Sequence, residues 1–236
     1  MTKNKPSNVD MWLERETDHI RKALESASRY FDSNDHLTVN TLEAIYGQES
    51  SFGNDMRTRG ADVAAGHFHL QIPTAKRYDL NVSIKNDQRF DIDYASSAAA
   101  RYLKDLDNMF SRKTNLGKGL ETIPIKSVSE RKKFTLGAYN IGEGRITDAQ
   151  HLAEKAGRDP QVWTDVKMFL EAAGASKIKA NETRQYVEKV PLYESEFAAK
   201  SLADKNLKQK KPRKERYRCT EGHWVTIDDR HVFICD

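Results

Sequence analysis

The chain has 236 residues, of which 38% are hydrophobic and 31% are charged, and its formal net charge is +4. This length predicts one folded domain with its own core and a small appendage. No apolar run approaches the roughly 18 residues of a membrane-spanning helix, and charges occur throughout the first thirty residues. Neither a transmembrane segment nor a secretory signal peptide is therefore expected.

The net charge is concentrated near the C-terminus. Residues 1–199 carry equal numbers of basic and acidic side chains, residues 200–218 carry a net charge of +7, and residues 219–236 carry −3. Because the body of the chain is neutral, no nucleic-acid partner is expected. The basic stretch is typical of a solvated linker, and contact with an anionic polymer or a membrane surface is the functional alternative.

The N-terminal part of the chain predicts two helices. Residues 9–31 show one amphipathic pattern, and a second helix follows the break at Ser33, Asn34 and Asp35. An apolar stripe runs along this second helix and includes a glutamate, Glu49. The apolar members of the stripe are Leu42, Ile45, Tyr46 and Phe52.

Glu49 is the first candidate functional residue. A carboxylate that faces a core is costly because desolvation disfavours its ionised form, and a carboxyl that keeps its proton near neutral pH can act as a general acid. The turn-prone residues Ser50, Ser51 and Gly53 predict that the helix ends here, with Glu49 near an exposed end. The alternative is a buried glutamate that accepts hydrogen bonds from backbone donors at a helix end.

Most of the remaining chain is predicted to be helical. Residues 54–70 are loop-like, and residues 111–128 are irregular. Asp159 and Pro160 are typical of a helix N-cap and first turn. Helices are expected from near Thr74 to before Asn81, at 93–110, at 129–140, at 145–156, at 160–173, and at 180–205 with an interruption at Pro191.

The C-terminus changes to a period of two residues. Residues 223–227 and 231–235 alternate around Asp228 and Asp229, which predicts a β-hairpin. The lysine-rich stretch before it, 208–214, contains a proline and is expected to be a linker.

The two cysteines lie at the ends of this hairpin. A two-residue turn pairs Thr226 with His231 and His223 with Ile234. Strand alternation then places the two histidines on opposite faces, which argues against a zinc site that they would form with the cysteines. A disulfide between Cys219 and Cys235 is favoured, and free thiols are the alternative.

Four short motifs occur in order between residues 42 and 190. They are Gln-Glu-Ser-Ser-Phe at 48–52, Gly-His-Phe-His-Leu at 66–70, Ala-Tyr-Asn-Ile-Gly at 138–142 and Glu-Thr-Arg-Gln-Tyr-Val at 182–187. Each motif is weak alone, but together and in this order they resemble the catalytic domain of the soluble lytic transglycosylase (SLT) family, which cleaves bacterial peptidoglycan. Residues 138–167 are particularly similar to membrane-bound members of that family.

The resemblance implies a mainly α, lysozyme-like (α+β) fold and a reaction at a single carboxylic acid. Glu49 would protonate the oxygen of the MurNAc–GlcNAc β-1,4 bond and then take the proton of the MurNAc C6 hydroxyl, which closes onto C1 as a 1,6-anhydro sugar. Neither a cofactor nor a metal nor a second carboxylate is required, unlike hydrolases with paired acids. The residues expected to bind substrate are Ser50, His69, Tyr139, Asn140 and Tyr186, and Glu182 is expected to be structural.

Some residues depart from the family pattern and leave alternatives open. His69 stands where the family usually has glutamine; it can still donate a hydrogen bond to a sugar, but it favours a non-catalytic glycan-binding or wall-assembly protein as one alternative. Asp55 and Asp62 follow Glu49 closely, and a carboxylate there that orients a water would make the protein a hydrolytic muramidase. His67 and His69 alone make a poor metal site because no third ligand accompanies them.

These expectations divide the chain into an N-terminal helical segment (1–37), an SLT-like domain (38–199), a basic linker (200–218) and a hairpin (219–236). The expected partner is the glycan strand of peptidoglycan, and a secretion or cell-wall machinery is a further candidate. The expected function predicts a location in the bacterial periplasm or cell envelope.

Overall fold

The computed structural model describes the chain except for residues 1–4, 34–35, 58–62, 211–221, 228–229 and 236. It contains two compact units, Met1–Ala199 and Lys200–Asp236. The finer division of the chain into four parts stays a prediction.

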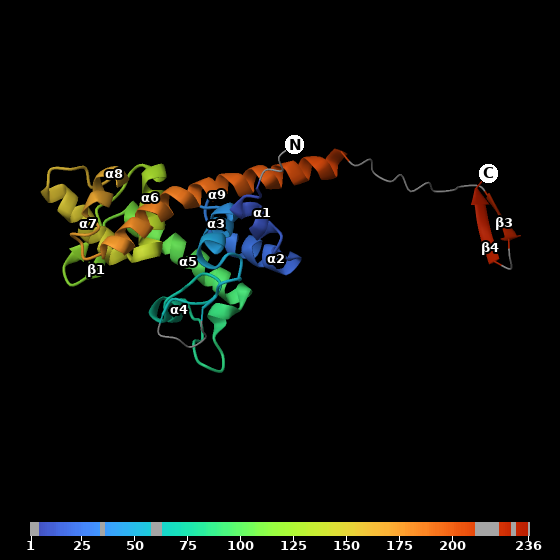
Figure 1. Cartoon of the computed structure of the whole chain (residues 1–236), viewed down its shortest axis with the longest axis horizontal. Coiled ribbons are helices and arrows are strands. Elements are labelled where there is room, and N and C mark those ends of the chain that lie inside the picture. The colour runs from blue at the N-terminus through green and yellow to red at the C-terminus, as the bar shows by residue number, and fades with distance from the viewer. Residues whose placement is uncertain (1–4, 34–35, 58–62, 211–221, 228–229, 236) are drawn as a thin grey trace. The chain divides into compact units, whose positions relative to one another are not determined.

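Helices make up most of the first unit, which confirms the expected mainly α fold (Figure 1). Its helices are α1 (Asn8–Leu13), α2 (Asp18–Ala27), α3 (Val39–Ser50), α4 (Ile72–Arg77), α5 (Ile92–Ser111), α6 (Val128–Ile141), α7 (Glu143–Lys155), α8 (Trp163–Val166) and most of α9 (Lys177–Lys210). Three short 3₁₀ turns lie at Ser28–Tyr30, Gln88–Phe90 and Lys167–Phe169.

The expectation of a single helix over residues 9–31 is wrong. α1 ends at Leu13, and α2 begins at Asp18 because Thr17 adopts an extended backbone and its side chain accepts a hydrogen bond from the Ile20 N–H. The apolar pattern continues across this break, since both helices face the same core. Periodicity alone therefore could not reveal the new N-cap.

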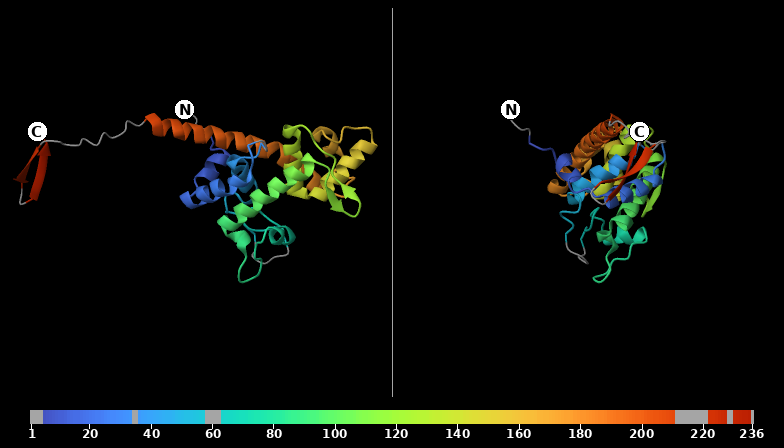
Figure 2. Two further views of the ribbon diagram at one scale, coloured as in Figure 1. Left: turned by 180° about the vertical axis from the view of Figure 1, so that it is seen from behind. Right: turned by 90° about the vertical axis from the view of Figure 1, so that its right-hand side faces the viewer.

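α5 connects several elements of the first unit. It packs against α2, α3 and α6 (Figures 1 and 2). Ala99, Leu103, Leu106 and Phe110 on its apolar stripe are fully buried, as the pattern over residues 93–110 predicted. Full burial of a leucine side chain contributes roughly 1.5–3 kcal/mol, so this stripe is a principal source of stability.

An aromatic cluster fixes α3 between α1 and α9. The ring centroids of Trp12 and Tyr193 lie 4.8 Å apart, and Phe197 stacks at 5.8 Å from Phe52. Gly47 of α3 lies directly under Trp12, where a Cβ atom would come within 2.3 Å of the indole. The close approach therefore requires glycine at this position and sets the direction of α3.

α9 continues through Pro191, so the expected interruption is wrong. Proline lacks an N–H and its ring crowds the preceding turn, which normally kinks or ends a helix. Here Val190 and Phe197 on either side are buried against the core. We attribute the continuity of the helix to this packing, which outweighs the lost backbone bond.

Two further segments differ from the sequence-based expectation. Instead of a helix over 160–173, the chain forms the four-residue α8 and a 3₁₀ turn, because the Asp159 carboxylate accepts the Gln161 N–H and makes a turn before the helix. The region 111–128 contains a small antiparallel pair, β1 (Asn115–Gly117) and β2 (Leu120–Glu121). Gly117 and Gly119 adopt φ of +90° and +78° in its turn.

The second unit contains the predicted C-terminal hairpin. β3 (Gly222–Ile227) pairs antiparallel with β4 (Arg230–Cys235). The register confirms the expected pairs Thr226–His231 and His223–Ile234, and it places Trp224 opposite Phe233. The disulfide prediction involves Cys219, which lies outside the described residues.

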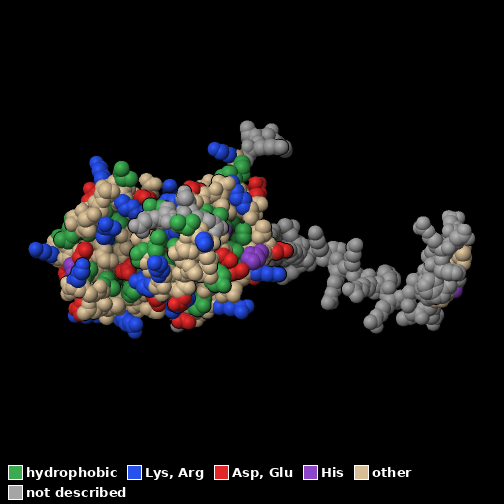
Figure 3. All heavy atoms as spheres, turned by 90° about the horizontal axis from the view of Figure 1, so that it is seen from below, with side chains coloured by type: hydrophobic (Ala, Val, Ile, Leu, Met, Phe, Trp, Pro, Cys, Tyr) green, Lys and Arg blue, Asp and Glu red, His purple; other side chains and the backbone are tan. Residues whose placement is uncertain are grey.

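The surface of the molecule mixes both signs of charge. On the face drawn in Figure 3, the lysine and arginine side chains are interspersed with aspartate and glutamate, in keeping with the neutral balance of residues 1–199. Within the described parts of the chain, none of the helices has both the length and the apolar character needed to cross a bilayer.

The turn between α1 and α2 places Glu16 near Glu43 of α3. Burial, and then the negative charge of Glu16, raises the pKa of Glu43 to about 8. Arg21 forms an ion pair with Glu16 at 2.5 Å and opposes this shift. Glu43 therefore binds its proton more tightly in the folded chain than in the unfolded chain.

We expect the free energy of unfolding to decrease as the pH rises from about 5 to about 8. A carboxyl whose folded pKa lies above its unfolded value stabilises the protein when protonated, with a slope of at most about 1.4 kcal/mol per pH unit. The variant Glu43→Gln should lose this dependence and be more stable than the wild type at pH 8. Urea unfolding at pH 5, 6.5 and 8 measures the slope of unfolding free energy against pH for the wild type and for Glu43→Gln. Equal slopes in the two proteins would show that Glu43 is not the group responsible.

Candidate active site

A cavity of about 480 Å³ opens between α3, the chain that follows it, α6 and α9. Its walls come from segments far apart in the sequence, and polar and charged groups make up much of them. The residues that line it are Glu49, Arg57, Ala64, His69, Leu70, Gln71, Thr74, Tyr102, Tyr139, Asn140, Ile141, Gly142, Glu143, Gly144, Arg145, Lys179 and Glu182.

Glu49 lies at the C-terminal end of α3, on the cavity wall. Leu42, Ile45 and Tyr46 of its stripe are fully buried, whereas 15% of the Glu49 side chain remains exposed. Ser51 ends the helix in the left-handed conformation, at φ +51°. The last turn of α3 therefore borders the cavity, and Glu49 lies near the exposed end of the helix, as the sequence predicted.

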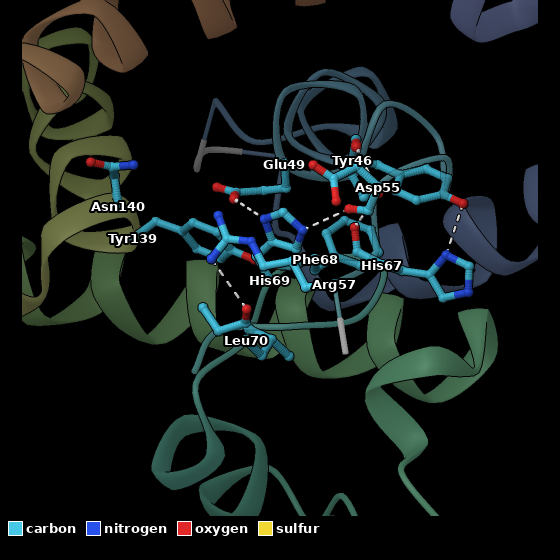
Figure 4. A network of polar contacts seen from close by, with 12 residues as sticks. Tyr46, Glu49, Asp55, Arg57, His67, Phe68, His69, Leu70, Tyr139 and Asn140 are labelled. Atoms are coloured by element: carbon cyan, nitrogen blue, oxygen red, sulfur yellow. Dashed lines mark hydrogen bonds and ion pairs between the residues drawn. The ribbon is translucent and has the colours of Figure 1, made fainter. Parts of the chain in front are cut away.

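His69 contacts Glu49 directly (Figure 4). Its Nδ1 lies 3.3 Å from Oε2 of Glu49, and its Nε2 lies 2.8 Å from the backbone oxygen of Asp55. Only 5% of the His69 side chain is exposed. The imidazole therefore bridges α3 and the loop that follows it, and it limits the directions in which Glu49 can turn.

A buried arginine holds the loop that carries His69. Arg89 is fully buried, forms an ion pair with Asp87 at 2.8 Å, and donates to the backbone oxygens of Val63 and Leu70. The Arg89 backbone oxygen lies so close to Gly66 that a Cβ there would come within 2.0 Å, and Gly66 has φ +83°. This position therefore requires glycine for both space and conformation.

Two tyrosines approach Glu49 from α6 and α9. The Tyr139 hydroxyl donates to the backbone oxygen of Phe68 at 3.0 Å. The Tyr186 hydroxyl is buried and lies near Glu49. Burial, and then the nearby charge of Glu49, raises the pKa of each phenol well above its usual range, so both stay neutral at physiological pH.

Asn140 is held in a fixed orientation on the opposite wall. Its side-chain N–H donates to Glu182 at 3.0 Å, and its side-chain oxygen accepts from Thr183 at 2.7 Å. Glu182 also forms an ion pair with Lys179 at 2.7 Å. Burial opposes ionisation of Glu182, but the bonds from Lys179 and Asn140 outweigh it and lower its pKa.

Ser50 lies beneath the cavity rather than on its wall. The residue is fully buried. Its hydroxyl donates to the backbone oxygen of His67 at 2.7 Å and accepts from the Gly53 N–H at 3.1 Å. The structure thus places Ser50 where it ties α3 to the loop of His69, while its predicted contact with substrate stays a prediction.

The muramidase alternative depends on Asp55 or Asp62, and the metal-site alternative depends on His67 and His69. Asp55 is exposed and offers its backbone oxygen to His69, and Asp55 is not among the residues that line the cavity. Asp62 lies outside the described residues. His67 Nδ1 is 2.8 Å from the Tyr46 hydroxyl. Burial lowers the pKa of His67. Figure 4 shows the two imidazole rings apart, with that of His67 beside Tyr46 and that of His69 beside Glu49.

Sequence reasoning missed a second network on the cavity wall. Glu143, at the start of α7, accepts hydrogen bonds from Arg77 at 3.0 Å and from Tyr102 at 3.1 Å. Burial opposes its ionisation, but bonds from its own backbone and from Arg77 prevail and lower the pKa of Glu143. Gly142, at φ +97°, separates α6 from α7 and turns this residue toward the cavity. Gly142 was the available signal in the sequence, but the two partners of Glu143, Arg77 and Tyr102, come from distant helices.

Comparison with known proteins identifies the family. The family model "Transglycosylase SLT domain" matches residues 27–162. This range includes Glu49, His69, Tyr139 and Asn140, whereas Glu182 and Tyr186 lie beyond it.

Curated relatives from Shewanella and Aeromonas species share one name, membrane-bound lytic murein transglycosylase F. The protein from Shewanella loihica is 32% identical over 129 residues, which is 55% of this chain and 23% of the relative. That from Shewanella frigidimarina is 31% identical over 180 residues (72% and 33%), and that from Aeromonas hydrophila is 29% identical over 162 residues (64% and 28%). The chain thus spans a third or less of these relatives' length. It belongs to the transglycosylase SLT domain family.

Proposed function

We propose that this protein is a peptidoglycan lytic transglycosylase that cleaves the MurNAc–GlcNAc β-1,4 bond and leaves a 1,6-anhydroMurNAc end. The observation that carries the proposal is the position of Glu49, a mostly buried carboxyl on the wall of a polar cavity. Family membership and the names of the relatives support the same activity.

The other carboxylates that line the cavity are unsuited to act as the acid. Glu182 is tied to Lys179 and Asn140, and Glu143 is tied to Arg77 and Tyr102. These partners lower the pKa of both carboxyls and hold them as carboxylates. Glu49 is the remaining carboxyl among the described lining residues, and it therefore takes the role of general acid.

The reaction requires two proton transfers at Glu49, which ends in the same protonation state in which it began. Glu49 donates its proton to the glycosidic oxygen while the bond from that oxygen to C1 of MurNAc breaks. The resulting carboxylate then takes the proton of the C6 hydroxyl while O6 bonds to C1. The 1,6-anhydro ring forms, and Glu49 regains its proton. Because the attacking group belongs to the sugar, no water enters the reaction.

The surrounding residues orient this chemistry. Tyr139 and Asn140 line the cavity, where we propose that they contact the sugar, and His69, which also lines the cavity, contacts Glu49. Tyr186 of α9 is buried near Glu49 and is not among the cavity-lining residues, so its predicted contact with substrate stays a prediction. Glu182 is structural, since it holds the Asn140 amide in place.

Product analysis tests the reaction type. Purified sacculi digested with the protein should yield fragments lighter by one water than the products of hydrolysis. Borohydride treatment should leave their MurNAc ends unchanged, because an anhydro ring has no free reducing carbon. Mass spectrometry before and after reduction measures both the mass of the fragments and their resistance to borohydride. Reducible MurNAc ends as the main product would instead identify a hydrolytic muramidase.

The proposed substrate places the protein in the bacterial periplasm or cell envelope, in line with relatives that are named membrane-bound. Association with a secretion or cell-wall machinery stays a prediction.

A further inference from the structure

The two ring nitrogens of His69 face acceptors of different kinds. Nε2 lies 2.8 Å from the backbone oxygen of Asp55, and a carbonyl oxygen can only accept a hydrogen bond. Nε2 therefore carries a hydrogen whenever this contact is made. Nδ1, the other nitrogen, lies 3.3 Å from Oε2 of Glu49 (Figure 4). The protonation of Nδ1 is thus coupled to that of Glu49.

A proton shared between Nδ1 and Oε2 would hold the two side chains together. If Nδ1 and Glu49 both lacked a proton, a nitrogen lone pair would face a carboxylate oxygen in a poorly solvated place, and the two would repel. One proton between Nδ1 and Oε2 removes this repulsion, whichever atom carries it. That proton points from one protein group to the other, so it is directed away from the cavity.

We propose that the productive site carries two protons: one on Nδ1 of His69, donated to Oε2 of Glu49, and one on Oε1 of Glu49, directed at the substrate. The proposal rests on the proposed function. When Oε1 gives its proton to the glycosidic oxygen, the imidazolium stabilises the carboxylate that forms. The carboxylate then recovers a proton from the C6 hydroxyl, and the Nδ1 proton stays in place throughout. His69 thereby acts as a positioning residue through Glu49.

The other ionisable groups around the pair do not exchange protons in the same pH range. Tyr139 and Tyr186 stay neutral, because their pKa values are raised well above the usual range. The lowered pKa values of Glu143 and Glu182 keep both carboxylates charged beside Arg77 and Lys179.

The neighbouring histidine and the cations of the cavity are held in one protonation state by their surroundings. His67 is buried, bonded to Tyr46, and has a lowered pKa, which favours its neutral form. Arg57 and Arg145 line the cavity and remain cations at all relevant pH values. The protons on which the reaction depends are therefore those carried by Glu49 and His69.

The pH dependence of initial rates tests the proposal, with His69→Gln as the matched variant. The glutamine amide can donate to Glu49 but neither gains nor loses a proton. In the wild type, the rate on the alkaline side should decrease by about tenfold per pH unit at first and then by about a hundredfold, as the second proton is lost. In His69→Gln the decrease should stay at about tenfold. Identical profiles for the two proteins would overturn the proposal.

A measurement without turnover completes the test. Nitrogen-15 NMR of histidine-labelled protein, with the His69 signals assigned from their loss in His69→Gln, should show Nε2 protonated throughout and Nδ1 taking up a proton as the pH falls. In Glu49→Gln this uptake should move to lower pH, because the carboxylate that favours it is gone. An unshifted Nδ1 titration would overturn the proposal whatever the rate profiles show. Wild-type protein that cleaves nothing at any pH would instead refute the proposed function.

Discussion

Replacement of Glu49 by glutamine is expected to decrease the rate of glycan-strand cleavage by ~10²–10⁴-fold or more. The amide has nearly the size and shape of the carboxyl and can still contact His69, so the fold should persist. It cannot donate a proton to the glycosidic oxygen or take one from the C6 hydroxyl. Release of soluble fragments from purified sacculi measures the rate, and circular dichroism with thermal unfolding checks the fold.

Glu43→Gln provides a matched control for this substitution. Glu43 belongs to the same helix but lies near Glu16 and is not among the cavity-lining residues. The same chemical change there should leave the cleavage rate unchanged. If Glu49→Gln kept more than half of the wild-type rate while folded, Glu49 would not be the general acid, and the proposed mechanism would be wrong.

The helix that carries Glu49 could be predicted because its signals are local. Leu42, Ile45 and Tyr46 recur at helical spacing, and Ser51 ends the helix in the conformation that turn-prone residues favour. The stripe together with the turn-prone residues that follow Glu49 therefore suffices to place Glu49 near an exposed end of α3. The four motifs also led to the family, and their residues from α3, α6 and α9 gather around one cavity.

The contact between His69 and Glu49 could not be predicted in the same way. It depends on a loop in which His69 itself adopts φ +44°, a conformation that few residues other than glycine favour. That loop is shaped by Gly66 and by Arg89, which lies twenty residues further along the chain. Sequence reasoning identified His69 as a departure from a pattern and expected it to contact sugar; it could not give the partner of each ring nitrogen.

The errors in secondary structure share one physical cause. Thr17, Asp159 and Pro191 each carry a local signal whose effect depends on what surrounds it. Thr17 starts a helix inside a continuous apolar pattern, and the Asp159 side chain closes a turn rather than a helix. At Pro191, packing of the neighbouring turns outweighs the local preference against a helix.

Replacement of Arg89 by methionine is expected to lower the free energy of unfolding by about 3–5 kcal/mol. Arg89 and Asp87 are both fully buried and face each other at 2.8 Å. Methionine fills much of the same volume but removes the Arg89 cation from the buried Asp87 carboxylate, and removing one partner of a buried ion pair costs more than replacing the whole pair. Urea unfolding at neutral pH measures the change.

Lys113→Met is the control for loss of a cation from an ion pair. Lys113 pairs with Glu121 at 2.6 Å, but the two side chains are 67% and 41% exposed, so the expected cost is below about 1 kcal/mol. The double variant Asp87→Asn, Arg89→Met should recover part of the loss, because the Asp87 charge is removed together with that of Arg89. Full recovery is not expected, since the backbone oxygens of Val63 and Leu70 also lose a donor. A cost for Arg89→Met no larger than that for Lys113→Met would show that this buried pair does not hold the loop of His69.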